Sequence, residues 1–524
     1  MEPDQPRGKP PSRIAIDTGG TFTDGVATFP DGTTRSVKVL SSAALRGRVL
    51  ASSGGDDLKV RLSQRSIPIG LLEGFSLQRP GGSPLATVLE HPAEEVLRLD
   101  TGLSLAEGDA VELSAPFDAP RLAIHLLMGS TEKTLDAREL SLRVATTRGT
   151  NALLERKGEP FALILDEGLE DLLEIGDQSR PDIFALDIER DRLTPELVIG
   201  IGGRLAADGT AEPTVEEVDH DEIADAIDSA GVNTVGIALA HAWRTPERER
   251  AVAGALRERG VENVICSTDL SRADRLLPRA ETTAVEATLS PILGRFIDDL
   301  LPSSKRMPGS TFVMTSAGGL EPAETFRAKD GLLSGPAGGV AGAARSARAS
   351  GFEALLGFDM GGTSTDVSRY QDDFIYRFET RVGPARIQAP CIAIETVAAG
   401  GGSICHVTDE GLAVGPRSAG ATPGPACYGA GGPLTITDVN LLSGRGDPDQ
   451  FGIPIDMAHS EAALSTLRTE LVEQGFTDPG RDATLEGLRN IANERMAEAM
   501  RSISIREGVD PARHILVPFG GAGG

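Results

Sequence analysis

Two stretches that lie far apart in the chain carry the same pattern of aspartate, glycine and threonine. The first reads DTGGTFTD from Asp17 to Asp24, and the second reads DMGGTSTD from Asp359 to Asp366. A Gly-Gly pair lets the backbone approach a ligand closely, so that successive N–H groups and nearby threonine hydroxyls can converge on phosphate oxygens. The aspartate before each pair would face the Mg²⁺ that accompanies such phosphates, largely through water. The repeated pattern therefore predicts binding of a polyphosphate.

The pattern supplies a set of candidate site residues in each copy. We expect catalytic roles for the leading aspartates, which would also face the metal, and for the first threonine of each copy: Asp17, Asp359, Thr21 and Thr363. The glycines and the second threonines are expected to bind phosphate: Gly19, Gly20, Thr23, Gly361, Gly362 and Thr365. The closing aspartates, Asp24 and Asp366, are expected to hold the hairpins by hydrogen bonds to their own backbone. The alternative is a pair of ordinary β-hairpins with polar tips.

The elements that must position these residues can be predicted from the flanking sequence. Each copy follows a short apolar run, RIAI or ALLGF, which predicts a buried strand that ends at the aspartate. Two such hairpins facing one another would hold a polyphosphate from both sides. Elsewhere, NTVGIALAHAW at residues 233–243 predicts a strand after a helical stretch, an alternation typical of α/β folds. Apolar residues at helical spacing predict helices at 281–301 and 485–503.

Charge and composition limit the ligands and the partners. The 524 residues carry a formal net charge of -26, which argues against a nucleic-acid groove because such grooves depend on lysine and arginine. No run of about 18 apolar residues occurs, so a membrane span is not expected. Residues 1–12 are polar and proline-rich, lack the apolar stretch of a secretory signal, and are expected to be disordered. We expect a cytoplasmic protein.

The four cysteines give little sign of chemistry. Cys266, Cys391, Cys405 and Cys427 lie far apart and form neither a C-x-x-C pair nor a zinc pattern. We expect buried thiols in a reducing compartment. Cys427 lies in the proline- and glycine-rich string PGPACYG, where a functional role is the alternative.

The doubled pattern resembles the phosphate-binding hairpins of the actin-like and sugar-kinase ATPase superfamily. More narrowly, the chain resembles the hydantoinase A and 5-oxoprolinase family through strings that occur in the family's order. These strings are GTNALLERKG (149–158), SGPAGGV (334–340), TVAAGGGSI (396–404), GPRSAGATPGPACYGAGGPLTITDVNLLSGR (415–445) and FGGAGG (519–524). The resemblance implies an α/β, actin-like (ribonuclease-H-type) ATPase fold of two lobes, with ATP and Mg²⁺ as cofactors.

The resemblance also extends the site and divides the chain. Gly400, Gly401 and Gly402 are expected to form a further phosphate or nucleotide loop, with a tight structural turn as the alternative. In relatives the turn at Gly520 and Gly521 approaches the adenosine and the chain then continues, so we expect the ATPase region at 241–524 to be incomplete. The other expected divisions are a first lobe with the first hairpin (13–42), a β-rich insert (43–142) and the remainder of the hydantoinase/oxoprolinase N-terminal region (143–240).

The activity that the resemblance implies is ATP-dependent opening of a cyclic amide, 5-oxoproline or a hydantoin, by phosphorylation of the lactam oxygen before hydrolysis. Ser334, Ser418 and Tyr428 lie in segments rich in glycine or proline that would present polar groups to a small ring. Asn151 is expected to cap a helix that begins at Ala152. A hydantoinase-B-like subunit or fused domain would complete the site in an oligomer. The alternatives are a β-type subunit of an ATP-dependent ketone carboxylase and a nucleotide-gated binding module.

Overall fold

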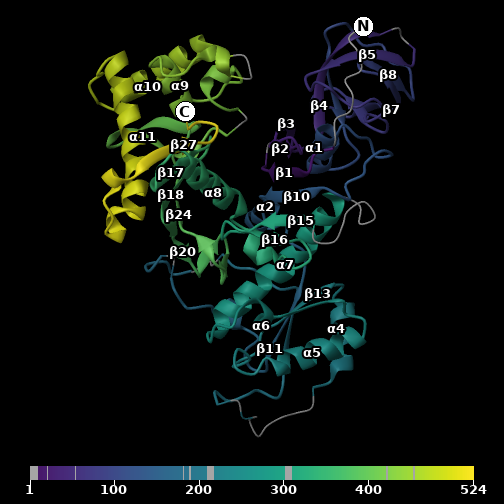
Figure 1. Ribbon diagram of the computed structural model, residues 1–524. Coiled ribbons are helices and arrows are strands. Elements are labelled where there is room, and N and C mark those ends of the chain that lie inside the picture. The colour runs from purple at the N-terminus through teal and green to yellow at the C-terminus, as the bar shows by residue number, and fades with distance from the viewer. Residues whose placement is uncertain are drawn as a thin grey trace. The chain divides into compact units, whose positions relative to one another are not determined.

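The computed structural model describes residues 10–20, 22–52, 55–180, 182–187, 191–208, 210, 218–300, 310–420, 423–451 and 455–523 (Figure 1). The chain divides into two compact units. The first unit comprises Met1–Gly335 and Phe378–Cys391, and the second comprises Pro336–Arg377 and Ile392–Gly524. The first glycine hairpin therefore belongs to the first unit and the second hairpin to the second unit.

The first hairpin is part of a six-stranded sheet with the strand order β16-β15-β10-β1-β2-β3. Side chains of β1 alternate between its two faces, so Ile14 and Ile16 are buried in the core while Asp17 is exposed on the other face. The helix α1 covers the buried face. The elements of this layer are β1 (Arg13–Thr18), β2 (Phe22–Thr28), β3 (Thr34–Leu40), β10 (Ser141–Thr146), β15 (Thr311–Met314), β16 (Leu320–Pro322) and α1 (Ala119–Met128).

A closed β-barrel follows β3 in the chain. Its strands, in order around the barrel, are β4 (Ala44–Ser52), β5 (Asp57–Leu62), β8 (Val96–Leu99), β7 (Pro84–Ala93), β6 (Ser76–Gln78) and β9 (Ala110–Ser114). Buried residues such as Val49, Val60, Leu77 and Val111 belong to the same apolar core as the sheet. Closure pairs each strand with two neighbours and so protects the strand edges. The barrel lies within residues 43–142, where the sequence predicts a β-rich insert.

The remainder of the first unit is an α/β layer with a parallel sheet of order β12-β11-β13-β14. The helix predicted at 281–301 is confirmed as α7. The strand predicted at 233–243 is shorter, because after Ile237 the N–H groups of Leu239 and Ala240 donate to Glu249 (2.9 Å) and Asp166 (2.6 Å) and leave the ladder. The elements are β11 (Ala162–Asp166), β12 (Leu197–Ile201), β13 (Thr234–Ile237), β14 (Asn263–Cys266), α2 (Arg148–Leu154), α3 (Leu172–Ile175), α4 (His220–Ser229), α5 (Glu247–Glu258), α6 (Ser267–Leu270), α7 (Leu276–Leu300), β21 (Thr380–Val382) and β22 (Ala385–Ile387).

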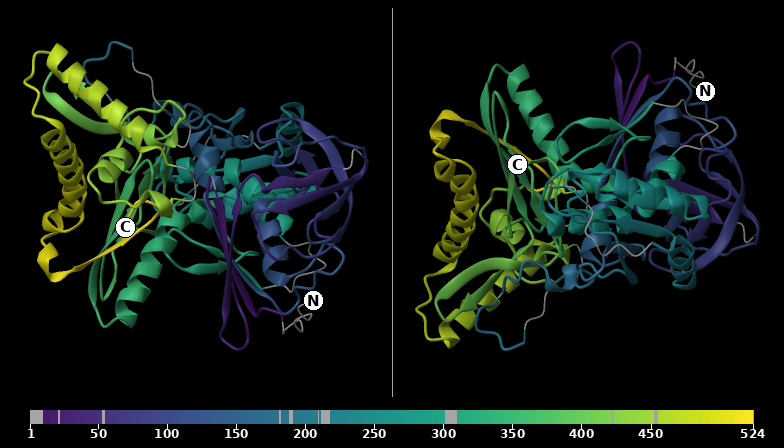
Figure 2. Two further views of the ribbon diagram at one scale, coloured as in Figure 1. Left: turned by 90° about the horizontal axis from the view of Figure 1, so that it is seen from above. Right: turned by 90° about the horizontal axis from the view of Figure 1, so that it is seen from below.

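The second unit is built on the sheet β19-β18-β17-β27, in which β24 also pairs with β18. The helices α8 and α11 cover opposite faces of this sheet (Figures 1 and 2), since Ala343 of α8 packs with Leu355 while Leu488 of α11 packs with Leu356. The helix predicted at 485–503 is confirmed as α11. The elements are α8 (Ser334–Ala349), β17 (Ala354–Met360), β18 (Thr365–Gln371), β19 (Asp373–Phe374), β20 (Tyr376–Arg377), β23 (Cys391–Ile392), β24 (Ile394–Val397), β25 (Ser403–Thr408), β26 (Gly411–Ser418), α9 (Ile436–Leu442), α10 (Met457–Glu473), α11 (Arg481–Ile503) and β27 (Ile515–Phe519).

The two units repeat one arrangement of four strands. In the first unit β10 runs parallel to β1, which pairs antiparallel with β2, which pairs antiparallel with β3. In the second unit β27, β17, β18 and β24 pair in the same order and with the same directions. The repeated sequence pattern is therefore the visible part of a larger repeat of strand topology.

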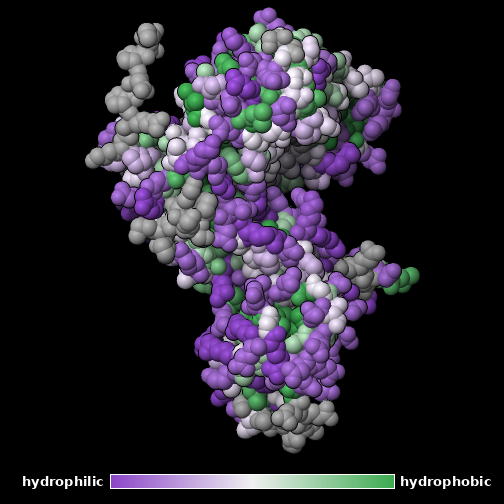
Figure 3. Space-filling view, turned by 90° about the vertical axis from the view of Figure 1, so that its right-hand side faces the viewer, coloured by the Kyte–Doolittle hydropathy of each residue, from purple (hydrophilic) through white to green (hydrophobic). Residues whose placement is uncertain are grey.

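A surface rich in polar side chains is expected for a chain with a net charge of -26. The face shown in Figure 3 is largely hydrophilic, with hydrophobic residues scattered over it. Within the described part of the chain, no helix has both the length and the apolar character needed to cross a membrane.

Candidate functional site

The tips of the two hairpins have the same geometry. Asp17 lies directly opposite Asp24 in the β1–β2 ladder, and Asp359 lies directly opposite Asp366 in the β17–β18 ladder. The turn is closed in each case by one backbone bond of 3.0 Å, from Gly19 N–H to Phe22 O and from Gly361 N–H to Ser364 O. The equal spacing of the residues thus gives equal strand register, and each tip presents a pair of carboxylates on one face. Thr21, predicted to be catalytic, lies outside the described residues.

The second threonine of each copy anchors the hairpin. Thr23 Oγ1 lies 3.2 Å from Ser41 Oγ, and Ser41 donates to Gly19 O at 2.8 Å. Thr365 Oγ1 donates to Ala399 O at 2.5 Å. Both threonines are fully buried on the face opposite the aspartates. Their hydroxyls support the tip from beneath, whereas Thr363 is exposed beside the second tip.

The carboxylates of the first hairpin are balanced by a lysine. Lys38 of β3 lies opposite Asp24 and donates to its two oxygens at 2.8 and 3.0 Å. The pKa of Asp17 is raised, chiefly because neighbouring protein atoms partly shield its carboxylate from water. The negative charge of Asp24 raises this pKa further, whereas the positive charge of Lys38 lowers it. The Asp24 carboxylate therefore accepts its hydrogen bonds from the neighbouring strand β3. The predicted hydrogen bond from Asp24 to its own backbone does not occur among the described residues.

The carboxylates of the second hairpin have a neutral partner. Thr396 of β24 lies opposite Asp366 and donates a hydrogen bond of 2.6 Å from Oγ1. Burial raises the pKa of Asp366, and this hydrogen bond lowers it. In the described residues, no group of three or more His, Cys, Asp or Glu side chains could hold a metal ion. Two opposed carboxylates beside an exposed turn do fit Mg²⁺, which keeps several waters and needs only one or two carboxylates besides phosphate oxygens.

The loop of Gly400, Gly401 and Gly402 braces the second tip. Gly401 N–H donates to Gly361 O at 3.0 Å and Gly402 N–H donates to Gly362 O at 2.6 Å. Gly400 N–H donates to Ser403 Oγ at 2.8 Å. A side chain at Gly400 would lie only 2.7 Å from Gly361 O, so the two backbones approach too closely for any other residue. These three N–H groups donate hydrogen bonds within the protein instead of pointing to a phosphate, which favours the alternative of a structural turn.

The turn at Gly520 packs against Asp359. Ala522 N–H donates to Met360 O at 2.8 Å, which ties this turn to the end of β17. A Cβ atom at Gly520 would overlap Asp359 Oδ1 and lie 2.6 Å from Met360 O, and Gly520 has a φ of +88° that favours glycine. Three glycine segments that are distant in the sequence therefore meet around the second hairpin: the tip itself, the 400–402 loop and the 520–521 turn.

The three residues predicted to bind the substrate belong to different units, Ser334 to the end of the first and Ser418 and Tyr428 to the second. Ser334 is buried in the first unit, where its hydroxyl donates to Thr146 O at 3.2 Å. In the second unit, Ser418 Oγ lies 3.5 Å from Gly362 O, next to the tip. Tyr428 follows Cys427 in a short 3-10 helix, and burial raises the pKa of its phenol. Only Ser418 is placed beside a hairpin tip by a contact within the described residues.

The cysteines are buried and unsuited to nucleophilic chemistry. All four are free thiols, and burial raises the pKa to about 12 for Cys266, about 11 for Cys391 and about 12 for Cys427. The pKa of Cys405 is also raised by burial. A raised pKa keeps a thiol protonated, and the thiolate is the reactive form.

The prediction for Asn151 is wrong, and the structure gives it another position. The helix α2 begins at Arg148 with Thr147 at its N-terminal boundary, so Asn151 lies within the helix. Its side-chain amide donates to Thr147 Oγ1 at 3.3 Å. A Cβ atom at Gly20 would lie 3.8 Å from Asn151 Nδ2, which places this amide beside the first tip. Asn151 and Lys38 are polar groups near the hairpin that sequence reasoning left out of the site.

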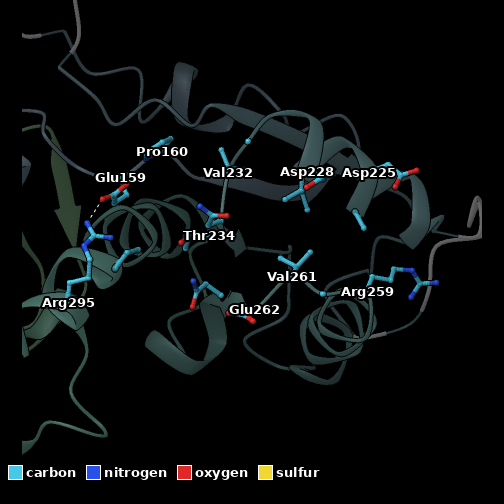
Figure 4. A pocket seen from close by; sticks show the side chains of 17 residues that line it. Glu159, Pro160, Asp225, Asp228, Val232, Thr234, Arg259, Val261, Glu262 and Arg295 are labelled. Carbon is cyan, nitrogen blue, oxygen red and sulfur yellow. Dashed lines mark hydrogen bonds and ion pairs between the residues drawn. The ribbon is translucent and has the colours of Figure 1, made fainter. Parts of the chain in front are cut away.

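A cavity of about 650 Å³ lies elsewhere in the first unit (Figure 4). It is formed by α4, by α7 and by the segments that precede β11, β13 and β14, and the Glu159–Arg295 ion pair lies in its wall. Ligands of open parallel sheets bind at the carboxyl ends of the strands, whereas this cavity lies at the amino ends. None of the predicted site residues within the described part of the chain lines it, so we assign it no part in the chemistry.

Family models match most of the chain. The model described as "Hydantoinase/oxoprolinase N-terminal region" matches residues 111–260, and the one described as "Hydantoinase/oxoprolinase" matches residues 279–524. The 5-oxoprolinase PfmaA of Pestalotiopsis fici is 36% identical over 476 residues, which cover 84% of this chain and 36% of that protein. The caprolactamase subunit alpha of Pseudomonas jessenii is 34% identical over 399 residues, 72% of this chain and 56% of that subunit. The chain thus spans little more than a third of the 5-oxoprolinase.

Solved structures share the fold. The ATP-dependent caprolactamase of Pseudomonas jessenii superposes with a TM-score of 0.72 and 26% identity, over 97% of this chain and 65% of that one. Nucleotide-free acetone carboxylase superposes with a TM-score of 0.61 and 21% identity, over 98% of this chain and 66% of that one, a likeness of fold alone. From the two family models and the similarity to 5-oxoprolinases along most of its length, it follows that the chain belongs to the hydantoinase/oxoprolinase family.

Proposed function

We propose that this chain is the ATP-handling part of an ATP-dependent cyclic amide hydrolase of the 5-oxoprolinase or hydantoinase type. The observation that carries the proposal is the duplicated hairpin, in which the same residues, the same register and the same turn hydrogen bond recur in both units. Relatives that are named 5-oxoprolinase and caprolactamase support a cyclic amide as the substrate. The repeated four-strand arrangement supports an actin-like fold with one phosphate-binding hairpin in each unit.

The tip glycines indicate that a ligand approaches the backbone. A Cβ atom at Gly362 would meet no atom within 4 Å, and one at Gly20 would meet only Asn151 at 3.8 Å. Neither glycine has the left-handed φ that would exclude other residues. The fold therefore does not require glycine at these two positions, whereas phosphate oxygens that bind backbone N–H groups do require an open approach.

The Gly362→Ala variant tests this interpretation. We expect its thermal midpoint to match that of the unaltered chain, while its affinity for Mg-ATP falls by about tenfold, since the added methyl group would occupy the path to the tip. Isothermal titration with Mg-ATP measures the affinity. The matched control is Gly342→Ala in α8, where a Cβ atom also meets no other atom within 4 Å. Equal affinities of all three proteins would remove Gly362 from the phosphate site.

The proposed reaction follows from the stability of the amide. An unstrained lactam is stabilised by resonance, so its oxygen would first accept the γ-phosphoryl group while the bond to ADP breaks. Water would then add to the activated carbon, and the ring C–N bond would break with a proton passing to nitrogen, which leaves an acyl phosphate. A second water would hydrolyse this acyl phosphate to a carboxylate and free phosphate. Thr363 and the tip N–H groups would position the phosphoryl group. Bound Mg²⁺ would offset the negative charge that accumulates on the transferring group, and Asp17 and Asp359 are the carboxylates proposed to face it.

A partner is part of the proposal. The caprolactamase relative is described as subunit alpha, which supports a second subunit or fused domain of the hydantoinase-B type. That partner would complete the site at which the ring opens. The ketone carboxylase alternative is supported only by the likeness of fold to acetone carboxylase. Both reactions begin by phosphorylating an oxygen, so the substrate is what distinguishes them.

Phosphate release from ATP tests the proposed function. The full chain, mixed with a hydantoinase-B-like subunit, would be assayed with 5-oxoproline, hydantoin or caprolactam, and separately with bicarbonate and acetone. We expect release that depends on one of the rings and that equals the amount of ring opened. Release that depends on bicarbonate and acetone would favour the carboxylase instead. Release that no substrate stimulates would favour the nucleotide-gated module.

A further inference from the structure

The cavity of about 650 Å³ in the first unit carries more negative than positive charge in its lining (Figure 4). Its charged side chains are four carboxylates and two guanidinium groups: Glu159, Asp225, Asp228, Glu262, Arg259 and Arg295. Both arginines are already paired, Arg295 with Glu159 in the wall and Arg259 with Asp221, which does not line the cavity. Three carboxylates of the lining are left over from these pairs.

These three carboxylates come from two sides of the cavity. Asp225 and Asp228 are three residues apart in α4 and so lie on one face of that helix, whereas Glu262 directly precedes β14. Figure 4 shows the two aspartates along one side of the cavity and Glu262 on the other. All three are exposed, and their side chains make no hydrogen bond or ion pair within the part of the chain that the structure describes. They do not form a group that could hold one metal ion together, so they suit separate cationic groups better than a single ion.

A buried hydroxyl group also lines the cavity. Thr234 begins β13, and only 1% of its surface is exposed. Its hydroxyl makes no hydrogen bond to any described residue, and the oxygen is not sealed from solvent. Buried polar groups normally have a hydrogen-bond partner. A ligand in the cavity would supply the partner that the described residues do not.

The opposite ends of the same strands are filled by protein groups. At the carboxyl end of β11, the fully buried Asp166 accepts a hydrogen bond of 2.6 Å from Ala240 N–H. Glu249 is also fully buried and accepts one of 2.9 Å from Leu239 N–H, after the carboxyl end of β13. Arg279, likewise fully buried, donates to Leu239 O at 2.8 Å. Protein side chains thus occupy the place where ligands of open parallel sheets usually bind, whereas the amino ends border the cavity.

We infer that this cavity binds a small organic cation with two or more ammonium groups, that is, a linear diamine or polyamine. Its ammonium groups pair with the three carboxylates, and one of them donates to the Thr234 hydroxyl. Apolar side chains of the lining, such as Ile227, Val232 and Val261, contact the methylene groups between the charges. The volume lies within the range of cavities that take small molecules. The site is separate from the proposed ATP chemistry and does not depend on it.

Titration calorimetry of the full chain with spermidine tests the inference. At low salt we expect one bound spermidine, held more tightly than 1,4-diaminobutane and far more tightly than methylamine, because each further ion pair adds to the affinity. The triple variant Asp225→Asn, Asp228→Asn, Glu262→Gln is expected to bind spermidine about tenfold more weakly. Thr234→Val is expected to bind it about threefold more weakly. The thermal midpoint of Thr234→Val should not fall, since the change removes a buried hydroxyl that has no partner in the described protein.

The matched control removes three exposed carboxylates from the barrel segment of the same unit, in the variant Asp56→Asn, Glu94→Gln, Glu107→Gln. We expect this control to bind spermidine as the unaltered chain does. Equal weakening in both triple variants would overturn the inference, because it would show a general attraction to an acidic chain. Affinity that is the same for spermidine and methylamine, or no binding of spermidine, would also overturn it. Should the first triple variant not fold, Thr234→Val decides: weaker binding supports the site, and unchanged binding overturns it.

Discussion

Asp359→Asn is expected to slow ATP hydrolysis in the reconstituted reaction by about 10²–10³-fold, a loss of about 2.7–4 kcal/mol of transition-state stabilisation. Asparagine keeps the shape of the side chain and removes its charge. Asp359 is the last residue but one of β17, opposite Asp366, and it lies next to the Gly520 turn. In this position its charge would help to hold the cation against the phosphates. Phosphate release at saturating Mg-ATP, followed over a range of Mg²⁺ concentrations, measures the loss and shows whether more metal restores the rate.

The control for this variant is Asp372→Asn. Asp372 is exposed and follows β18, at the end of that strand away from the tip. The substitution Asp372→Asn therefore removes one negative charge from the same unit without touching the tip. The φ of 62° at Asp372 is a conformation that asparagine tolerates well. We expect the control to hydrolyse ATP at the unaltered rate. If Asp359→Asn also retained a rate within about threefold of the unaltered chain, Asp359 would have no catalytic role.

Gly520→Ala is expected to destabilise the second unit by about 2–5 kcal/mol. The left-handed backbone at this residue costs a side-chain-bearing residue about 1–2 kcal/mol, and the overlap of the new methyl group with its neighbours costs about 1–3 kcal/mol. The neighbours that must move are Asp359 Oδ1 and Met360 O, so the variant would also displace the carboxylate at the tip. Urea unfolding measured by circular dichroism gives the change in the free energy of unfolding.

The neighbouring glycine provides the matched control. A Cβ atom at Gly521 would meet no atom within 4 Å, and its φ is not left-handed. Gly521→Ala is therefore expected to unfold at nearly the same urea concentration as the unaltered chain. Equal stability of the two variants would show that the turn does not pack against Asp359 as described.

Much of the site could be predicted because its signals are local. An apolar run, a glycine pair and a second polar run lie within a few residues of one another, and strand register across a tight turn follows from the turn itself. The helices α7 and α11 were predicted for the same reason, since their 3.6-residue period is contained in the segment. The duplication of the hairpin was likewise readable from Asp17–Asp24 and Asp359–Asp366.

Other parts of the prediction failed where a residue's role depends on distant partners. The strand at 233–243 ends early because Asp166 and Glu249, which are remote in sequence, take the N–H groups that would extend it. Asn151 is not a cap because α2 begins one turn earlier than its sequence suggests. Threonines of one pattern likewise differ in exposure, since a buried neighbour holds Thr365 while Thr363 is open.

Two glycine hairpins, each after a buried strand and each with its own pair of carboxylates, can be predicted from the amino-acid sequence alone. The residues that surround them depend on how distant segments pack. The pairing of β3 with β2 brings Lys38 to Asp24, and the pairing of β24 with β18 brings Thr396 to Asp366. The 400–402 loop and the 520–521 turn reach the second tip in the same way. Such contacts join segments far apart in the chain, and the core packing and hydrogen bonding of the whole unit decide which segments meet.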